Sequence, residues 1–465
     1  MRQEFDVVVI GGGPGGYVCA EQLAKYGLST ALVEKDALGG TCLNRGCIPT
    51  KTLLHAGELL DEVEKTKTWG LSFGAPTIDR SALLMRKEEV VGALRQGVEK
   101  MLSGAKVTVF QGEGYVPEAG VVRVTGADGE VTELQTKDIV AAVGTIPAMP
   151  PIPGIDLPGV ITSDHILNEL PEAERLIIIG GGVIGMELAS LYLSLGTQVT
   201  VLEGMARVLP SMDREFGQSL TMLMKKRGAQ IVTDAMVEQI TLEDGQLSCH
   251  YTAKAKPGVA TGDRVLIAVG RRSLLPNLFA PELEIACNRG RAVVDKQMRS
   301  NLEHIYVIGD CADGYPQLAH AASAQGLAAA AAIAGQPFDT DLNLVPGCVY
   351  TQPEIASVGI TEAEAKEQGI AVHVGKYPTS ANGKSLLTGQ ERGFIKLVAD
   401  ENDVLIGAQL MCARATDMIG ELALAIDQKM TAAQVAALIR PHPTFEESIG
   451  EAAKICAEKG LAKNR

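Results

Sequence analysis

Residues 7–16 read VVVIGGGPGG, a β-branched run that opens into a glycine-rich turn. The run Val7–Ile10 predicts a buried strand, and Tyr17–Tyr26 after the turn predicts a helix. In the turn, Gly11 permits a tight bend, Gly13 lets the backbone approach a pyrophosphate, and Gly16 allows close helix–sheet packing. The N-terminus of the following helix favours a phosphate group. The stretch therefore predicts a dinucleotide-binding unit.

An acidic residue follows at the distance that such a unit needs. Ser29–Val33 predicts the second strand, and Glu34 ends it, 18 residues beyond Gly16. A carboxylate at this place can accept a hydrogen bond from a ribose hydroxyl. One glycine turn alone is a weak signal, because it can also be a packing turn without any ligand.

The same pattern occurs a second time. Leu176–Ile179 predicts a strand and Met186–Leu195 a helix, and Glu203 follows 18 residues beyond the last turn glycine. Three glycines shape the turn: Gly180, Gly182 and Gly185. Two complete copies argue against packing alone, so we expect two bound dinucleotides with electron transfer between them.

Glu203 bears on the choice of the second dinucleotide. A carboxylate hydrogen-bonds a free 2′-hydroxyl but repels a 2′-phosphate. Gly204 and Met205 offer no arginine that could hold a phosphate. We therefore expect NAD rather than NADP, the alternative being that Glu203 is a solvated residue at a strand end.

A cysteine pair lies between the two turns, where residues 39–51 read GGTCLNRGCIPTK. Five residues of regular helix would separate Cys42 and Cys47 by about 7.5 Å along the axis, which exceeds the ~7 Å limit on Cα separation in a disulfide. A bond between them needs a distorted turn, which Gly46 and Pro49 favour. Such a bond would be strained and easily reduced.

Positive charge flanks the pair. Arg45 and Lys51 would favour the thiolate form of a nearby cysteine. The alternative interpretation is that the two cysteines are buried structural thiols.

The chain resembles the pyridine nucleotide-disulfide oxidoreductases nearly end to end, and within them most the branch that oxidises dihydrolipoamide with NAD+. In that family the stretch G-G-T-C-x-N-x-G-C-x-P-x-K holds a redox disulfide beside FAD, and residues 39–51 carry every fixed position. The resemblance implies that Cys47 faces the flavin and that Cys42 exchanges with substrate. It also implies that Lys51 lies near the flavin ring and pairs with Glu187. Alternatively, Glu187 is only a favourable carboxylate in a first helical turn.

Further cofactor contacts are implied by the same resemblance. They comprise Gly114, Gly144, Asp310, Leu318, Ala319, His320, Val237 and Gly270. Asp310 follows a predicted strand and would bind the ribityl chain of FAD, and Leu318–His320 would start a helix under the flavin. Val143 and Gln325 replace the threonine and the glutamate that are usual in the family. For His320, the alternative is a hydrogen-bonded core histidine.

Residues 440–448, which read RPHPTFEES, are expected to hold one imidazole at an irregular bend. The two prolines push the residues before them into extended conformations, so His442 lies outside the helix that follows. The resemblance assigns Glu447 to orient His442 as general base and acid for the thiol. Alternatively, Glu447 caps the helix with Thr444, and the two roles would compete for one carboxylate. The family pattern is H-A-H-P-T, so Arg440-Pro441 is a departure that affects the expected approach of substrate.

Composition restricts the partners. The 465-residue chain has a net charge of −14, which argues against nucleic acid and anionic membranes as partners. No spanning segment or leader is expected, and the odd number of scattered cysteines, nine, favours the reducing cytoplasm over a disulfide framework. No metal site is expected.

The expected fold class is α/β, with two Rossmann-like, doubly wound parallel domains and an α+β C-terminal dimerisation domain. The boundaries are 1–146 for the FAD-binding domain, 147–274 for the NAD-binding domain, 275–345 for a central FAD-contacting region and 346–465 for the interface domain. The resemblance implies a homodimer in which the C-terminal tail completes the partner's site.

The expected reaction passes electrons from dihydrolipoamide through Cys42–Cys47 and FAD to NAD+. The substrate would be carried by a lipoyl-bearing protein of a 2-oxoacid dehydrogenase, glycine cleavage or acetoin system. Three alternatives stay open. One is a reductase of a low-molecular-weight disulfide, which usually uses NADPH, and another is a mercuric or thioredoxin type, although the C-terminal tail has only Cys456. The third is a non-catalytic flavoprotein that acts as an assembly subunit.

Overall fold

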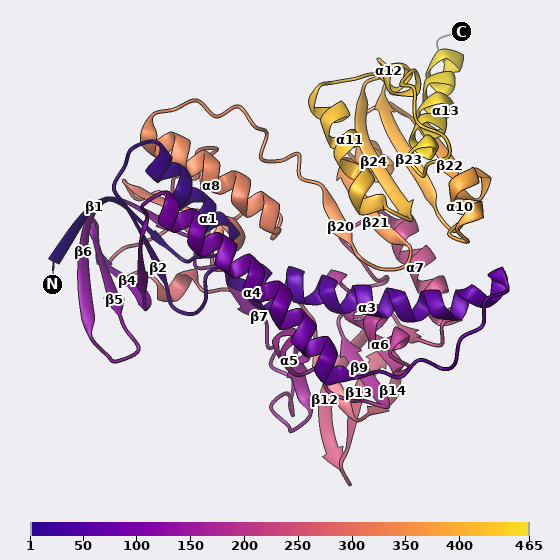
Figure 1. Cartoon of the computed structure of the whole chain (residues 1–465), viewed down its shortest axis with the longest axis horizontal. Coiled ribbons are helices and arrows are strands. Elements are labelled where there is room, and N and C mark those ends of the chain that lie inside the picture. The colour runs from indigo at the N-terminus through magenta and orange to yellow at the C-terminus, as the bar shows by residue number, and fades with distance from the viewer. Residues whose placement is uncertain (1, 464–465) are drawn as a thin grey trace.

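The computed structural model describes residues 2–463 and forms three lobes (Figure 1). An N-terminal sheet and a C-terminal sheet lie at opposite ends, and a second parallel sheet lies between and below them in this view. The mixed α/β architecture confirms the expected fold class.

The N-terminal sheet carries the first glycine turn. Its strands are β1 (Arg2–Ile10), β2 (Thr30–Glu34), β3 (Thr108–Gln111), β4 (Glu113–Glu118), β5 (Val121–Thr125), β6 (Val131–Ala141) and β19 (Ile305–Val307). Strands β3-β2-β1-β6-β19 are parallel, whereas β4 and β5 continue from β6 in antiparallel. The expected parallel sheet is thus mixed, because β6 is long enough to pair with β5 along its first half and with β19 at its end. Helices α1 (Pro14–Lys25) and α8 (Ala319–Ala334) pack together against this sheet.

The second sheet carries the second glycine turn and is wholly parallel. Its order is β11 (Gln230–Val232), β10 (Gln198–Leu202), β9 (Arg175–Ile179), β15 (Arg264–Ile267) and β8 (Val160–Thr162). The helices of this lobe are α5 (Ser163–Glu169), α6 (Val183–Ser194) and α7 (Arg214–Lys226). An antiparallel sheet of β12 (Ala235–Glu243), β13 (Gln246–Ala253) and β14 (Lys256–Gly262) adjoins it.

Short elements connect the lobes. They are β7 (Thr145–Pro147) paired with β16 (Arg271–Ser273), β17 (Cys287–Asn288) paired with β18 (Arg291–Ala292), and 3-10 turns at Thr66–Trp69, Leu275–Asn277, Gly309–Cys311 and Thr379–Ala381. The β7–β16 pair joins the chain segments that leave the first sheet and the second sheet.

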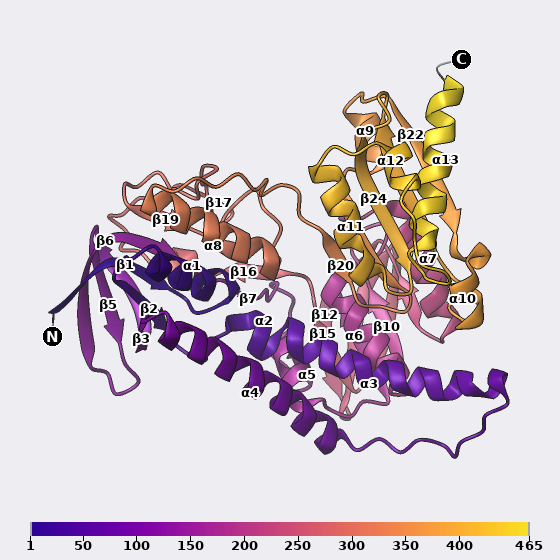
Figure 2. The ribbon, with the colours of Figure 1, turned by 45° about the horizontal axis from the view of Figure 1, so that its top comes forward.

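Two long helices cross between the lobes, and the sequence patterns did not predict them. They are α3 (Cys47–Lys65) and α4 (Arg80–Gly104), and a short helix α2 (Gly40–Arg45) precedes α3. Figure 2 shows α3 running from the N-terminal lobe along the second lobe, where it packs on α6. Pro49 lies in the first turn of α3, where a missing backbone N–H breaks no helical hydrogen bond.

The C-terminal lobe is α+β, as expected. Its antiparallel sheet has the order β20 (Gly347–Val349), β21 (Glu354–Gly359), β24 (Leu405–Cys412), β23 (Phe394–Asp400) and β22 (Val372–Pro378). Its helices are α9 (Glu362–Glu367), α10 (Gly383–Leu387), α11 (Ala415–Asp427), α12 (Ala432–Ala436) and α13 (Glu447–Lys463). Among the described helices, none combines the length and apolar character that crossing a bilayer would need.

A buried ion cluster joins the C-terminal sheet to the second lobe. The ammonium of Lys396 on β23 lies 2.5 Å from Asp213 and 2.9 Å from Glu215, at the start of α7. Burial alone would lower the pKa of Lys396, but its hydrogen bonds to the two carboxylates raise it overall. Lys376 pairs with the same Glu215, with 43% of its side chain exposed against 4% for Lys396.

Lys396→Ala should lower the free energy of unfolding by about 3–5 kcal/mol, because it leaves a buried carboxylate without its cation. Lys376→Ala is the matched control and should cost less than about 1 kcal/mol, since that pair is exposed. Urea denaturation followed by circular dichroism measures both. Equal losses in the two variants would contradict a buried, structurally important cluster.

Candidate active site

The turn between Cys42 and Cys47 is distorted, as the spacing requires. Helix α2 ends at Arg45, and α3 begins at Cys47. Between them Gly46 has a non-helical conformation, with φ −143° and ψ −108°. A Cβ atom at residue 46 would lie 2.9 Å from the carbonyl oxygen of Thr41. The break lets the two thiols hydrogen-bond each other.

The two thiols differ in their hold on the proton. The hydrogen bond from Cys42 lowers the pKa of Cys47 to about 7, helped by Lys51 and opposed by burial and by Glu187. The same hydrogen bond, together with burial, raises the pKa of Cys42. Cys47 also begins α3, where the helix dipole favours a thiolate. In the reduced pair, Cys47 therefore ionises near neutral pH while Cys42 keeps its proton.

Lys51 is held one helical turn beyond Cys47. Its ammonium lies 2.8 Å from Glu187 Oε2 on α6, as the resemblance implies. Glu187 is almost fully buried, and its Oε1 accepts a 2.9 Å hydrogen bond from the backbone N–H of Tyr350. The Lys51 ammonium also lies 4.6 Å from the centre of the Tyr350 ring. All three lobes thus meet at this ion pair.

Of the two cations that the sequence places beside the pair, Lys51 lowers the pKa of Cys47. The Arg45 guanidinium pairs with Asp36, nine residues earlier in the sequence. The contribution of Arg45 to the charge at the cysteines stays a prediction.

The first glycine turn forms an open cradle. Gly11 has φ +108°, and a Cβ atom at Gly16 would lie 1.8 Å from the Gly11 carbonyl oxygen. Gly13 caps α1 without a side-chain hydrogen bond, so the first-turn N–H groups stay open for phosphate. Glu34 accepts hydrogen bonds from Gly12 and Asp36 N–H, which fix its carboxylate where a ribose hydroxyl can reach it.

The second turn repeats this geometry. Gly180 has φ +111°, a Cβ atom at Gly185 would lie 2.0 Å from the Gly180 carbonyl oxygen, and Gly182 caps α6 with open space around it. Glu203 accepts hydrogen bonds from Met205 N–H at 2.6 Å and from the N–H of the turn residue 181. Glu203 is 6% exposed, so it is not the solvated strand-end residue of the alternative interpretation. Both cradles fit dinucleotides.

Other predicted cofactor residues lie around the first cradle. Asp310 accepts a 2.7 Å hydrogen bond from Thr145, Gly144 has φ +69°, and Gly114 lets β4 pack closely on β1. Leu318 precedes α8 and Ala319 starts it, as expected.

Four further positions complete the set of expected cofactor residues and their neighbours. His320 is exposed and bonds the Pro346 carbonyl, so it is not a core histidine. Gln325 is buried and accepts from Gly309 N–H at 2.7 Å, so its amide oxygen supplies the acceptor that a glutamate would. At the second cradle, Gly270 has φ +117°, and Val237 packs into a hydrophobic core.

His442 and Glu447 form the expected dyad. The imidazole Nδ1 lies 2.8 Å from Glu447 Oε1, and Glu447 Oε2 accepts from Thr444 N–H at 2.8 Å. These bonds, that of Thr444 first, lower the pKa of Glu447. The two roles expected to compete are therefore filled by separate oxygens of one carboxylate. The His442 side chain is 78% exposed, and within residues 2–463 no hydrogen bond joins it to Cys42 or Cys47.

Comparison with known proteins identifies the family. Residues 5–326 match the model described as pyridine nucleotide-disulphide oxidoreductase, and residues 345–453 match the dimerisation domain of that family. The chain belongs to this family. This oxidoreductase contains FAD and uses NAD as its electron acceptor or donor.

Several relatives of this oxidoreductase are similar over nearly their whole length. A dihydrolipoyl dehydrogenase of Bacillus subtilis (strain 168) is 38% identical, with 99% of this chain and 100% of the relative covered. Another from Geobacillus stearothermophilus is 38% identical, covering 97% and 96%. Among solved structures, the HOCl-induced flavoprotein disulfide reductase RclA from Escherichia coli has a TM-score of 0.86 at 30% identity, and LpdA from Mycobacterium tuberculosis has 0.88 at 25%. Each comparison covers 97% of this chain and 99% of the other.

Some residues that shape the oxidoreductase site were missed by sequence reasoning. Asn44 donates from one amide nitrogen to three carbonyl oxygens, those of Ala37, Leu38 and Gly40, and so fixes the loop before Cys42. Arg271 bonds Thr145 and reaches Thr41 beside the cysteine pair. Asn44 is a fixed position of the cysteine motif, which was the available signal, but the partners of Arg271 are distant in the sequence.

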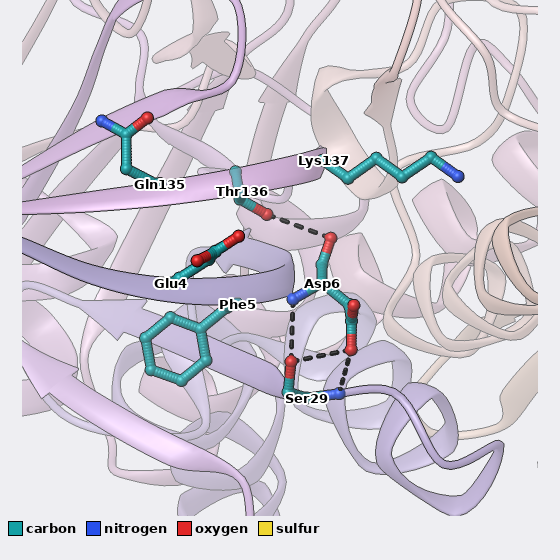
Figure 3. A pocket seen from close by; sticks show the side chains of 7 residues that line it. All are labelled: Glu4, Phe5, Asp6, Ser29, Gln135, Thr136 and Lys137. Atoms are coloured by element: carbon teal, nitrogen blue, oxygen red, sulfur yellow. Dashed lines mark hydrogen bonds between the residues drawn. The ribbon is translucent and has the colours of Figure 1, made fainter.

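One surface hollow lies over strands β1 and β6 of the N-terminal sheet (Figure 3). It is lined by Glu4, Phe5, Asp6, Ser29, Gln135, Thr136 and Lys137, none of which belongs to the site above. Three of its polar residues bond one another: Asp6 accepts from both the hydroxyl and the N–H of Ser29, and the Thr136 hydroxyl donates to the Asp6 carbonyl oxygen. We assign no ligand to it.

Titration of the reduced pair tests the electrostatics of the site. The pKa of Cys47 is about 7, so its thiolate should be lost as the pH falls below that value. Lys51→Met should move this midpoint upward because it removes a stabilising charge, and Glu187→Gln should move it downward. Ultraviolet thiolate absorbance of the reduced protein measures the midpoint. Midpoints that are the same in both variants would contradict the assigned causes.

Proposed function

We propose that the chain is a dihydrolipoyl dehydrogenase, which oxidises dihydrolipoamide carried by a lipoyl-bearing protein and reduces NAD+. The carrying observation is the Cys42–Cys47 pair, in which one thiol keeps its proton while the other ionises near neutral pH beside the Lys51–Glu187 pair. The names of the relatives support the substrate. The lipoyl-bearing protein would belong to a 2-oxoacid dehydrogenase, glycine cleavage or acetoin system.

The dithiol chemistry balances through the two cysteines. In the oxidised protein, a substrate thiolate attacks Cys42 Sγ, which forms a mixed disulfide and releases Cys47 as a thiolate. The second substrate thiol then attacks the substrate sulfur of that mixed disulfide, which frees Cys42 and closes the lipoamide disulfide. Lys51 stabilises the Cys47 charge, since its ammonium lowers the pKa of Cys47. FAD, when bound, relays the electron pair to NAD+.

His442 serves as the base in this proposal. It would take the proton of the attacking thiol, and Glu447 fixes the ring and stabilises the imidazolium through the 2.8 Å bond to Nδ1. The exposed dyad has no cysteine partner in its own described chain, which suits a homodimer whose tail completes the partner's site. Each cysteine pair would then work with the base of the other subunit.

The sheets support the proposed division of the chain. We assign FAD to residues 1–146 and 275–345, NAD to 147–274, and the subunit interface to 346–465. Strand β19 belongs to the first sheet although it lies far along the chain, and β20 begins the last sheet. A cysteine pair that must cycle suits a reducing compartment, so we place the protein in the cytoplasm.

Substrate assays with the FAD-loaded enzyme test the proposal. Dihydrolipoamide should reduce NAD+ much faster than NADP+, glutathione disulfide should not oxidise NADH, and Glu203→Ala should narrow the preference for NAD+. His442→Ala should lower kcat for dihydrolipoamide by about 10²- to 10⁴-fold, the usual contribution of a positioned base. Faster turnover with glutathione disulfide, or equal use of NADPH, would overturn the assignment.

A further inference from the structure

The segment before His442 has one buried side chain among exposed ones. Leu438 and Ile439 are 57% and 95% exposed, yet only 6% of the Arg440 side chain is accessible. This arginine stands where the family motif has histidine. The Arg440 side chain therefore does not face the substrate, because its guanidinium packs inside the C-terminal lobe.

Three helices converge on the Arg440 guanidinium. Nη2 pairs with Glu421 on α11, and Nη1 donates to the carbonyl oxygen of Val435 on α12 at 3.0 Å. On α13, a Cβ atom at Gly450 would lie 2.9 Å from Nη1, so the absence of a side chain there makes room for the arginine. One side chain thus ties the segment to three separate elements.

His442 lies between two residues that fix the segment, Arg440 before it and Glu447 after it. Glu447 at the start of α13 holds its ring, and Arg440 holds the backbone two residues before it. Because the imidazole itself is largely exposed, few contacts of its own fix its position. A base must be placed to within a fraction of an ångström to be effective.

We propose that the Arg440–Glu421 ion pair positions the His442 base for the substrate thiol. This rests on the proposed role of His442, and Arg440 itself is a positioning residue that touches neither substrate nor cofactor. It explains how this chain tolerates the replacement of the usual motif: the buried guanidinium of Arg440, paired with the partly exposed Glu421, fixes the segment that presents the imidazole.

The test compares two ion pairs whose acidic residues both lie on α11. Glu421→Gln breaks the pair with the buried guanidinium of Arg440, whereas Asp417→Asn breaks the exposed Arg414–Asp417 pair, in which both side chains are more than two-thirds exposed. Each variant is assayed as FAD-loaded protein in two reactions: oxidation of dihydrolipoamide by NAD+, and reduction of ferricyanide by NADH, which needs no thiol and no base. Melting temperature and flavin content show that the variants are folded.

Glu421→Gln should lower kcat for dihydrolipoamide by about 10- to 100-fold, the effect of a misplaced group, with KM and the ferricyanide rate nearly unchanged. Asp417→Asn should change neither reaction. Arg440→Lys should give an intermediate kcat, since an ammonium can pair with Glu421 but cannot reach the Val435 carbonyl in the same fork. If Glu421→Gln does not fold, Arg440→Lys against Asp417→Asn gives the same comparison.

Two outcomes would overturn the proposal. Wild-type kcat in the folded Glu421→Gln variant would show that the pair does not position the base, and an equal fall in both reactions would show a merely structural role. The failure of the proposed function has a different signature: the wild-type protein itself would not oxidise dihydrolipoamide, while its reduction of ferricyanide by NADH would persist. If only the base assignment failed, His442→Ala would keep the dihydrolipoamide activity of the wild type.

Discussion

The hydrogen bond between the Cys42 and Cys47 thiols is the contact on which the rest of the site depends. It exists because Gly46 ends one helix and lets another begin at once, which brings together two side chains that a regular helix would separate. The bond divides the protons unequally, so one sulfur is ready to carry charge and the other to exchange. Lys51 and Glu187 change the pKa of Cys47 further, in opposite directions.

Helix α3 connects the cysteine pair to the second lobe. Its first residue is Cys47, its second turn holds Lys51, and its length lies along α6 of the second lobe. Glu187 on α6 binds both Lys51 and the backbone that leads into the C-terminal lobe. The ion pair beside the cysteines therefore has contacts to all three lobes. The two dinucleotide cradles flank this helix system with nearly the same geometry.

Local patterns predicted much of the fold. The two glycine turns and the strands before them follow from β-branched runs beside glycines. The next strand of each unit, β2 or β10, leads to an acid, Glu34 or Glu203, whose carboxylate accepts a hydrogen bond from a backbone N–H of the turn. The helices α1 and α6 begin at Pro14 and Val183. Each begins three residues before its predicted start, at residue 17 or 186, because the turn glycine at position 13 or 182 already serves as its N-cap. Helix α3 escaped prediction because Pro49 suggests a break, although a proline is tolerated in a first turn.

The candidate site was predictable where its residues share one motif. The stretch from Cys42 to Lys51 and the dyad of His442 and Glu447 are of this kind. The contacts of Arg440, Arg271 and Tyr350 could not be predicted, because their partners come from elements distant in the sequence. For the same reason the inward fold of Arg440 could not be read from its place in the motif, where it looked like a change in the approach of substrate.

The central claim is that Cys42 and Cys47 form one reversible disulfide that NADH reduces. Alkylation of the FAD-loaded protein before and after NADH, with the labelled peptides mapped by mass spectrometry, tests it directly. The account predicts that these two cysteines are joined and unlabelled before NADH, that both become reactive after it, and that labelling of the other cysteines does not change. Labelling of Cys42 and Cys47 before NADH, to the same extent as after it, would contradict the account.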